Sequence, residues 1–438
     1  MQSQVVAASA FLFCCGLFYV LIWNKMPEKW PSFQAGNIPT RESDSFWRSG
    51  DEITGKFITT TGAPSLNLSS GKTTKGASEH HVPLNTSELK HQINITPIPI
   101  LYIKNFTKLP KWDFEDVYMQ SSEARRPVCS KSLQNSKDKE FQEAALWNIQ
   151  LWLHNGHLNV SEWNRLAHFN NPFGFMEYTY TDIKKSVDLI PKPKYNQLLP
   201  VPSGSEDGCI RCAVVGTGGI LNGSKMGKEI DSHDYVFRVN GAVTKGFEED
   251  VGNKTSVYVH TAFSLSQSVI HLGKYGFKYS PQDEGIKHVM IPEGLRDYEW
   301  IEGLLEKKRM TYGSYKGYRP LTFYNDRFQE DKFYVLHPDF LRYIRNRFMP
   351  SENLKESYWA LYRPTNGAFT LFLALHTCDI VHAYGFITAD HSKYPNYYFE
   401  TTKTRVVFYL NHDYNLEIKT WKKLHDAGII TLYQRQEN

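Results

Sequence analysis

The chain has 438 residues, of which 41% are hydrophobic and 14% are aromatic, so it can bury a sizeable core in one or two domains. Its formal net charge is +4 at pH 7, which is small for this length and argues against nucleic acid as a partner.

The first informative segment is the uncharged run VVAASAFLFCCGLFYVLIW at residues 5–23, which is about long enough to span a bilayer. A cleaved signal peptide is the alternative, but no basic residue precedes the run and no small-residue cleavage site follows it. The sequence therefore predicts a short cytoplasmic tail at residues 1–4 and a transmembrane signal-anchor at residues 5–23. Lys25 and Lys29 by themselves favour the opposite orientation.

Two signals outweigh those lysines and favour a lumenal body. Four cysteines lie beyond the anchor, an even number that suits two disulfides in an oxidising compartment. Sequons for N-glycosylation also recur there. They are Asn67, Asn85, Asn94, Asn105, Asn159, Asn222 and Asn253.

The composition changes along the rest of the chain. Residues 24–111 are rich in Ser, Thr, Gly, Asn and Pro and lack apolar periodicity, which predicts a disordered, glycosylated stem. Residues 112–438 contain short apolar runs separated by helical patterns. Helical patterns cover 138–154, 297–308 and 338–349. This alternation predicts a single α/β domain with parallel strands and covering helices.

One apolar run ends in a glycine cluster formed by Gly216, Gly218 and Gly219. Glycine permits a sharp turn and a close approach to a ligand, and a helix that begins there would offer N–H groups to a phosphate. We expect the segment through Lys228 to be helical. The turn is interpreted either as part of a nucleotide site or as a plain connection between elements.

The glycine cluster departs from the dinucleotide fingerprint of nicotinamide enzymes. Leu221 occupies the third glycine position, and the second strand ends in Arg238 and Asn240 where an acidic residue would hold a ribose. A Rossmann oxidoreductase is therefore disfavoured. The chain has no Walker-type phosphate loop, no D-x-D pair and no zinc-ligand spacing, so we expect neither a metal nor a cofactor.

The segment LYRPTNGAFTLFLALHTCDIVHAYGF, at 361–386, predicts a turn, a helix and a strand. Its turn supplies small polar donors where the helix begins. A disulfide between Cys212 and Cys378 would bring this turn and the glycine turn together into one compact nucleotide site.

The segment NHDYNLE, at 411–417, contains a candidate general base. A positioned histidine removes a hydroxyl proton near neutral pH, and Glu417 is placed to orient or charge-tune the imidazole of His412. A purely structural histidine is the alternative.

These segments together resemble the animal sialyltransferases, Golgi enzymes that transfer sialic acid from CMP-sialic acid to glycans. Cys212–Tyr258 is similar to their large motif, Leu361–Phe386 to their small motif and His412–Glu417 to their H-x-x-x-x-E motif. YRPTNGA, YGFIT and LHDAGIITLYQR look most like the α-N-acetylgalactosaminide α-2,6-sialyltransferases, which act on the GalNAc of mucin-type O-glycans.

The resemblance implies a fold, a location and residue roles. The fold would be Rossmann-like, with a mostly parallel sheet and helices on both faces, the sialyltransferase variant of the GT-A type. The protein would be a single-pass type II enzyme of the Golgi membrane, needing no metal, with CMP-sialic acid and O-glycosylated glycoproteins as its partners. His412 would be the base, and Cys212–Cys378 and Cys129–Cys209 would be disulfides. The donor-binding residues would be Thr217, Gly218, Asn240, Thr365, Asn366, Gly367, Asn396 and Tyr397.

Two positions depart from the family pattern. Thr217-Gly218 stands where the large motif often has Asn-Ser. Asn396 stands where a histidine commonly precedes the paired tyrosines. This difference predicts either weaker stabilisation of the leaving group or a neighbouring side chain, such as His391 or a tyrosine, in the role of the missing histidine. A catalytically silent lumenal glycan-binding module remains the alternative to an enzyme.

Overall fold

The fold is seen in a computed structural model that describes residues 96–106, 113–122, 125, 127–195 and 197–435. Its centre is an eight-stranded sheet of order β1-β6-β5-β4-β3-β2-β7-β8, parallel throughout except where β1 pairs with β6. The strands are β1 Trp152–Leu153, β2 Arg211–Val215, β3 Tyr235–Val239, β4 Val257–His260, β5 Lys287–Met290, β6 Phe333–Leu336, β7 Ile380–Tyr384 and β8 Thr431–Leu432.

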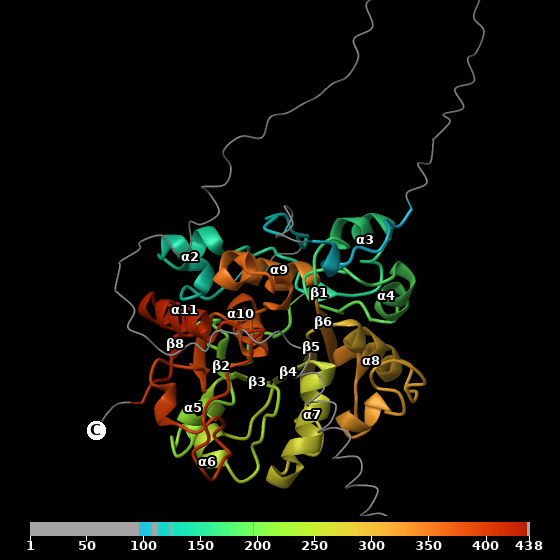
Figure 1. Ribbon diagram of the computed structural model, residues 1–438. Coiled ribbons are helices and arrows are strands. Elements are labelled where there is room, and N and C mark those ends of the chain that lie inside the picture. Colours follow the sequence, from blue (N-terminus) through green and yellow to red (C-terminus); the bar gives the residue numbers. More distant parts are fainter. Residues whose placement is uncertain (1–95, 107–112, 123–124, 126, 196, 436–438) are drawn as a thin grey trace, which may run out of the picture. The chain divides into compact units, whose positions relative to one another are not determined.

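Helices cover both faces of this sheet, as parallel strands require. In Figure 1, α9, α10 and α11 lie above the central strands and α5, α6 and α7 lie below them. The helices are α2 Lys139–Ala144, α3 Val160–Leu166, α4 Tyr180–Val187, α5 Gly227–Ser232, α6 Glu248–Val251, α7 Ala262–Leu272, α8 Leu295–Leu305, α9 Pro338–Arg347, α10 Asn366–Thr377 and α11 Tyr414–Asp426. The α/β class and the parallel sheet are therefore confirmed.

Helix α10 is buried from Ala368 to Thr377 and packs against β2, β3 and β7. A helix that is apolar all round must be enclosed by the protein, which fixes its place against the sheet. It runs antiparallel to the strands, as a crossover into parallel β7 requires, so it begins at their carboxyl edge and ends at Cys378 near their amino edge.

Both expected disulfides are present, Cys129–Cys209 and Cys212–Cys378. The second joins the start of β2 to the end of α10, with 6.2 Å between the Cα atoms. It therefore links the large and small motifs at the amino edge of the sheet. The expectation that this bond itself draws the two polar turns together is wrong, because both turns lie at the opposite edge.

Two local expectations also differ from the structure. The helix expected over 138–154 is only α2, because the backbone turns extended at Ala145 and the chain then forms β1 beside β6. The glycine turn leads into the short 3-10 turn Gly219–Leu221, and α5 begins only at Gly227.

Several predicted features fall outside the described residues: the tail at 1–4, the anchor at 5–23, most of the stem and the sequons Asn67, Asn85 and Asn94. In the part of the chain that is described, no helix is long and apolar enough to cross a membrane. At the end of the expected stem, Ile98 N donates to Asn164 Oδ1 over 2.8 Å, so residues 96–106 contact the folded body.

The remaining four sequons lie at exposed positions, which leaves each asparagine accessible. They are Asn105, Asn159, Asn222 and Asn253. Asn222 differs from the others because its Nδ2 donates to the carbonyl oxygen of Tyr398 over 2.7 Å.

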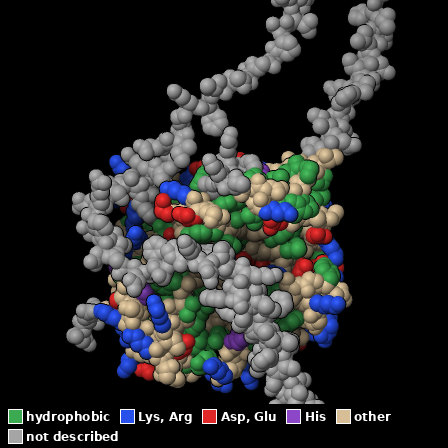
Figure 2. All heavy atoms as spheres, viewed as in Figure 1, with side chains coloured by type: hydrophobic (Ala, Val, Ile, Leu, Met, Phe, Trp, Pro, Cys, Tyr) green, Lys and Arg blue, Asp and Glu red, His purple; other side chains and the backbone are tan. Residues whose placement is uncertain are grey.

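Figure 2 shows Lys and Arg side chains around the lower edge of the face in view, with Asp and Glu side chains between them.

Removing the Cys212–Cys378 disulfide by the double substitution Cys212→Ser and Cys378→Ser should strongly destabilise the fold. The bond closes a loop with a sequence separation of 166, and the chain-entropy treatment gives about 5 kcal/mol for such a loop. Chemical denaturation of both proteins would measure the difference in the free energy of unfolding. An unchanged midpoint and slope would contradict the prediction.

Candidate active site

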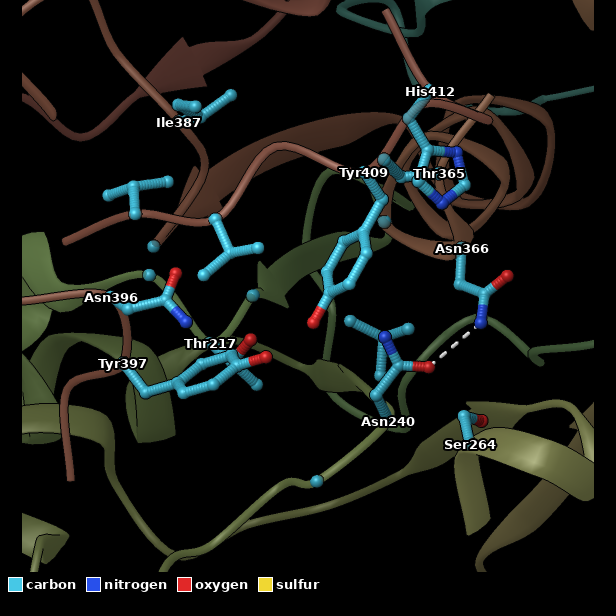
Figure 3. A pocket seen from close by; sticks show the side chains of 18 of the residues that line it. Thr217, Asn240, Ser264, Thr365, Asn366, Ile387, Asn396, Tyr397, Tyr409 and His412 are labelled. Atoms are coloured by element: carbon cyan, nitrogen blue, oxygen red, sulfur yellow. Dashed lines mark hydrogen bonds between the residues drawn. The ribbon is translucent and has the colours of Figure 1, made fainter. Parts of the chain in front are cut away.

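A pocket of about 800 Å³ opens at the carboxyl edge of the parallel strands. This edge is where doubly wound sheets generally bind ligands. The pocket brings together all nine residues predicted for catalysis and donor binding (Figure 3). They are Thr217, Gly218, Asn240, Thr365, Asn366, Gly367, Asn396, Tyr397 and His412.

The glycine turn after β2 forms one wall and packs tightly against other backbone. Gly218 N donates to Gly385 O over 3.0 Å. A Cβ at Gly218 would lie 2.6 Å from Gly385 O, and one at Gly219 would lie 1.8 Å from Pro395 O. These glycines are needed because neighbouring backbone fills the space of a side chain. Gly216, Gly218 and Gly219 also line the pocket, so close approach of a ligand to this turn stays a prediction.

Asn240 follows β3 in the left-handed conformation, with φ of 56°. Asparagine tolerates this region better than most residues. Tyr258 Oη donates to the carbonyl oxygen of Asn240 over 2.6 Å, and Asn366 Nδ2 donates to Asn240 Oδ1 over 2.9 Å (Figure 3). The side-chain bond joins the large-motif and small-motif segments directly inside the pocket.

The N-terminus of α10 forms the next wall. Thr365 caps the helix by accepting from Ala368 N, while Glu417 accepts from Thr365 N at 2.8 Å and from Thr365 Oγ1 at 2.9 Å. The helix dipole and unpaired N–H groups make such an end favourable for an anion. Burial raises the pKa of Glu417 to about 7. Glu417 therefore positions the helix start, and the expectation that it orients His412 is wrong.

His412 is oriented by the backbone of Arg363. Its Nδ1 donates to the carbonyl oxygen of Arg363 over 2.9 Å, because a carbonyl can only accept. The neutral ring then carries its free electron pair on Nε2, which has no hydrogen-bond partner among the described residues. Burial, followed by the positive charge of Arg363, lowers the pKa of His412 to about 4. The imidazole is therefore neutral and able to accept a proton.

The segment around Asn396 and Tyr397 closes the opposite side. Tyr397 forms an isolated antiparallel bridge with Gly218, and Tyr398 N donates to Thr217 O over 3.2 Å. Figure 3 shows the Asn396 and Tyr397 side chains beside Thr217, across the pocket from Asn366. His391 also lines the pocket, with Nδ1 donating to Thr388 O over 3.0 Å.

Part of the lining was not predicted from the sequence. Tyr409 projects into the middle of the pocket from the irregular segment before His412 (Figure 3). Phe263 and Arg296 line it from the first turns of α7 and α8. Arg363 also lines the pocket. It lies two residues before Thr365 in YRPTNG, so its place beside predicted site residues could have identified it. Within the described ranges, no group of three or more His, Cys, Asp or Glu residues could hold a metal ion.

Comparison with known proteins adds independent information. Residues 152–429 match glycosyltransferase family 29 (sialyltransferase). The chain is 49% identical over 336 residues to the chicken alpha-N-acetylgalactosaminide alpha-2,6-sialyltransferase 1, covering 76% of this chain and 59% of the relative. It is 44% identical to the human protein of that name, covering 85% of this chain and 64% of the relative. The chain thus spans about three fifths of the length of these two relatives.

A shorter relative is matched over most of its length. The mouse alpha-N-acetylgalactosaminide alpha-2,6-sialyltransferase 2 is 40% identical over 74% of this chain and 88% of its own. A crystal structure of a mammalian sialyltransferase aligns with a TM-score of 0.51 at 24% identity, covering 71% of this chain and all of that one, which shows a shared fold. The chain belongs to glycosyltransferase family 29, the sialyltransferases.

Proposed function

We propose that this protein transfers sialic acid from CMP-sialic acid, in α-2,6 linkage, to the GalNAc of mucin-type O-glycans on glycoproteins. One observation carries the proposal. The glycine turn, the start of α10 and the segment at 396–397 meet in one pocket with an oriented, neutral His412. The names of the relatives support the substrate class.

The donor would lie between the glycine turn and the N-terminus of α10. Thr217, Gly218 and Asn240 would line the CMP site from one side, and Thr365, Asn366 and Gly367 from the other. The CMP phosphate would lie at the N-terminus of α10, because the positive end of a buried 12-residue helix stabilises an anion. Asn396 and Tyr397 lie opposite, where an amide and a hydroxyl can donate to the leaving group.

The reaction would be a direct displacement. The acceptor 6-hydroxyl attacks the anomeric carbon of sialic acid, the bond to the CMP phosphate breaks, and the configuration inverts from β to α. His412 Nε2 takes the hydroxyl proton while CMP leaves with the bonding electrons. The transition state is oxocarbenium-like, so the protein acts by orienting the reactants and stabilising the departing phosphate. No step requires a metal.

The donor also prepares the base. A base with a pKa near 4 is weak at the mildly acidic to neutral pH of a secretory compartment. CMP-sialic acid brings a phosphate and a carboxylate, and nearby negative charge raises the pKa of an imidazole. His412 would thus become a stronger base once the donor is bound. We propose a lumenal catalytic domain, held at the Golgi membrane by the anchor expected at residues 5–23.

Replacing His412 by Ala or Gln should lower transfer of sialic acid to a GalNAc-Ser/Thr glycopeptide by about a hundred- to ten-thousand-fold, because general-base catalysis is lost. Affinity for CMP should change little, since the glycine turn and α10 are untouched. Labelled transfer and CMP titration measure the two effects. Retained transfer would remove His412 as the base, and absence of transfer by the wild type would favour a silent glycan-binding module.

Replacing Asn396 by His should raise turnover by up to about tenfold, because a charged donor binds a leaving phosphate more strongly than a neutral amide. Asn396→Gln is the matched control, since it changes the side-chain length without adding charge. Turnover of both variants at saturating donor and acceptor measures the effect. No gain with histidine would show that leaving-group stabilisation does not depend on this position.

Glu417 should make the fold less stable as the pH rises. Burial raises its pKa from 4.5 to about 7, so between those values the folded protein binds more protons than the unfolded chain. Stability from this group is therefore highest below its unfolded pKa and falls as the pH rises towards about 7. The drop in Tm from about pH 5 to about pH 7.5 should shrink in Glu417→Gln. An unchanged drop would contradict the assignment.

A further inference from the structure

The pocket extends beyond the donor-binding segments to a wall built by the first turns of α7 and α8. Phe263 lies on α7 and Arg296 on α8, while Glu293 precedes α8. The Arg296 guanidinium lies 4.7 Å from the centre of the Phe263 ring. Phe263 is 47% exposed, and the Arg296 side chain is 33% exposed. An arginine thus rests on an aromatic face at an accessible edge of the pocket.

Arg296 and Arg363 are the two Lys or Arg side chains in the described lining of the pocket, and they share one carboxylate. Arg296 Nη2 lies 3.2 Å from Glu293 Oε2, and Arg363 Nη2 donates to Glu293 Oε1. Arg363 Nη1 donates to Asn366 Oδ1 over 3.3 Å. Two positive charges therefore face one negative charge from Glu293.

The two arginines differ in what remains free. Arg363 is 12% exposed and both of its terminal nitrogens are engaged. Arg296 uses Nη2 for Glu293, whereas its buried Nε lies 4.0 Å from Asp297 Oδ2 and forms no hydrogen bond within the described residues. Asp297 already accepts from Ala262 N and Gly294 N. Nη1 of Arg296 has no partner in the described part of the chain, so it can receive an anionic ligand.

This charged cluster stands beside the proposed base. The backbone carbonyl of Arg363 holds His412 Nδ1, and its side chain holds Glu293. The electrostatic influence agrees with this proximity, because Arg363 lowers and Glu293 raises the pKa of His412. Arg363 and Glu293 thus connect Arg296 to the segment that orients the proposed base.

We propose that Arg296 is a carboxylate receptor that binds a sialic acid residue in this pocket and so determines which sugars are used. A guanidinium suits this task because its planar fork matches a carboxylate. The proposal rests on the proposed sialyl transfer. The carboxylate has two possible sources, the sialic acid of the donor and a sialic acid already present on the acceptor glycan.

The test uses Arg296→Gln in the full chain. The substitution leaves Glu293 paired with Arg363, and buried Asp297 keeps its hydrogen bonds from Ala262 N and Gly294 N, so the fold should be preserved. If the donor supplies the carboxylate, affinity for CMP-sialic acid should fall by about tenfold or more, while affinity for CMP stays unchanged. If the acceptor supplies it, kcat/KM should fall for a sialylated glycopeptide and stay unchanged for the unsialylated one.

Two variants serve as controls. Arg319→Gln removes an arginine of similar exposure, 38%, that is paired with Asp326 outside the pocket lining, and it should change neither ligand preference. Arg296→Lys should recover part of the preference because it keeps the charge without the fork. Equal losses for CMP and CMP-sialic acid, or no loss in either comparison, would overturn the carboxylate assignment. Failure of the wild type to bind CMP would instead overturn the proposed function.

Discussion

The burial of α10 is the constraint on which the site depends. Its residues from Ala368 to Thr377 are enclosed on all sides, so the helix cannot rotate or slide without exposing apolar surface or opening cavities. Its first turn is therefore held at the carboxyl edge of the sheet. Glu417 and Asn240 then secure Thr365 and Asn366 by side-chain hydrogen bonds. The hydrophobic core thus positions the polar groups of the pocket.

This arrangement separates stability from binding along one helix. The disulfide at Cys378 joins the far end of α10 to β2, whereas the ligand-facing groups lie at its beginning. A helix of 12 residues is about 18 Å long, so the covalent link and the pocket lie at opposite edges of the sheet. The bond restricts the unfolded chain while leaving the pocket lined by hydrogen-bonding side chains and backbone.

Strands β2 to β6 were predictable because each is a short, largely buried run of mostly apolar residues. Seven of the nine proposed site residues lay in motifs that follow a strand or precede or begin a helix, whereas Asn396 and Tyr397 lie in an irregular segment and were proposed from the family resemblance. The α7–α8 wall was not predictable in this way. Arg296 and Phe263 are 33 positions apart, and only the order of β4 and β5 in the sheet places their helices side by side.

Other predictions failed because contacts with distant segments overrode the local preference, and local periodicity does not reveal such contacts. Apolar spacing over 138–154 suited a helix, but β1 gains backbone partners on β6 at the open edge of the sheet. A helix was expected directly after the glycine turn, yet Gly219 packs so closely that Pro395 O occupies the space of its Cβ, and α5 begins only at Gly227. In both cases a segment distant in sequence decided the local conformation.

Burial also controls the charge state of the pocket before any ligand enters. It lowers the pKa of His412 to about 4 and raises that of Glu417 to about 7, so each is shifted towards its neutral form. The permanent charges left in the lining are then the two arginines and Glu293. An anionic sugar nucleotide would meet a site with little competing negative charge. Its own charge would make His412 more basic when there is a hydroxyl to deprotonate.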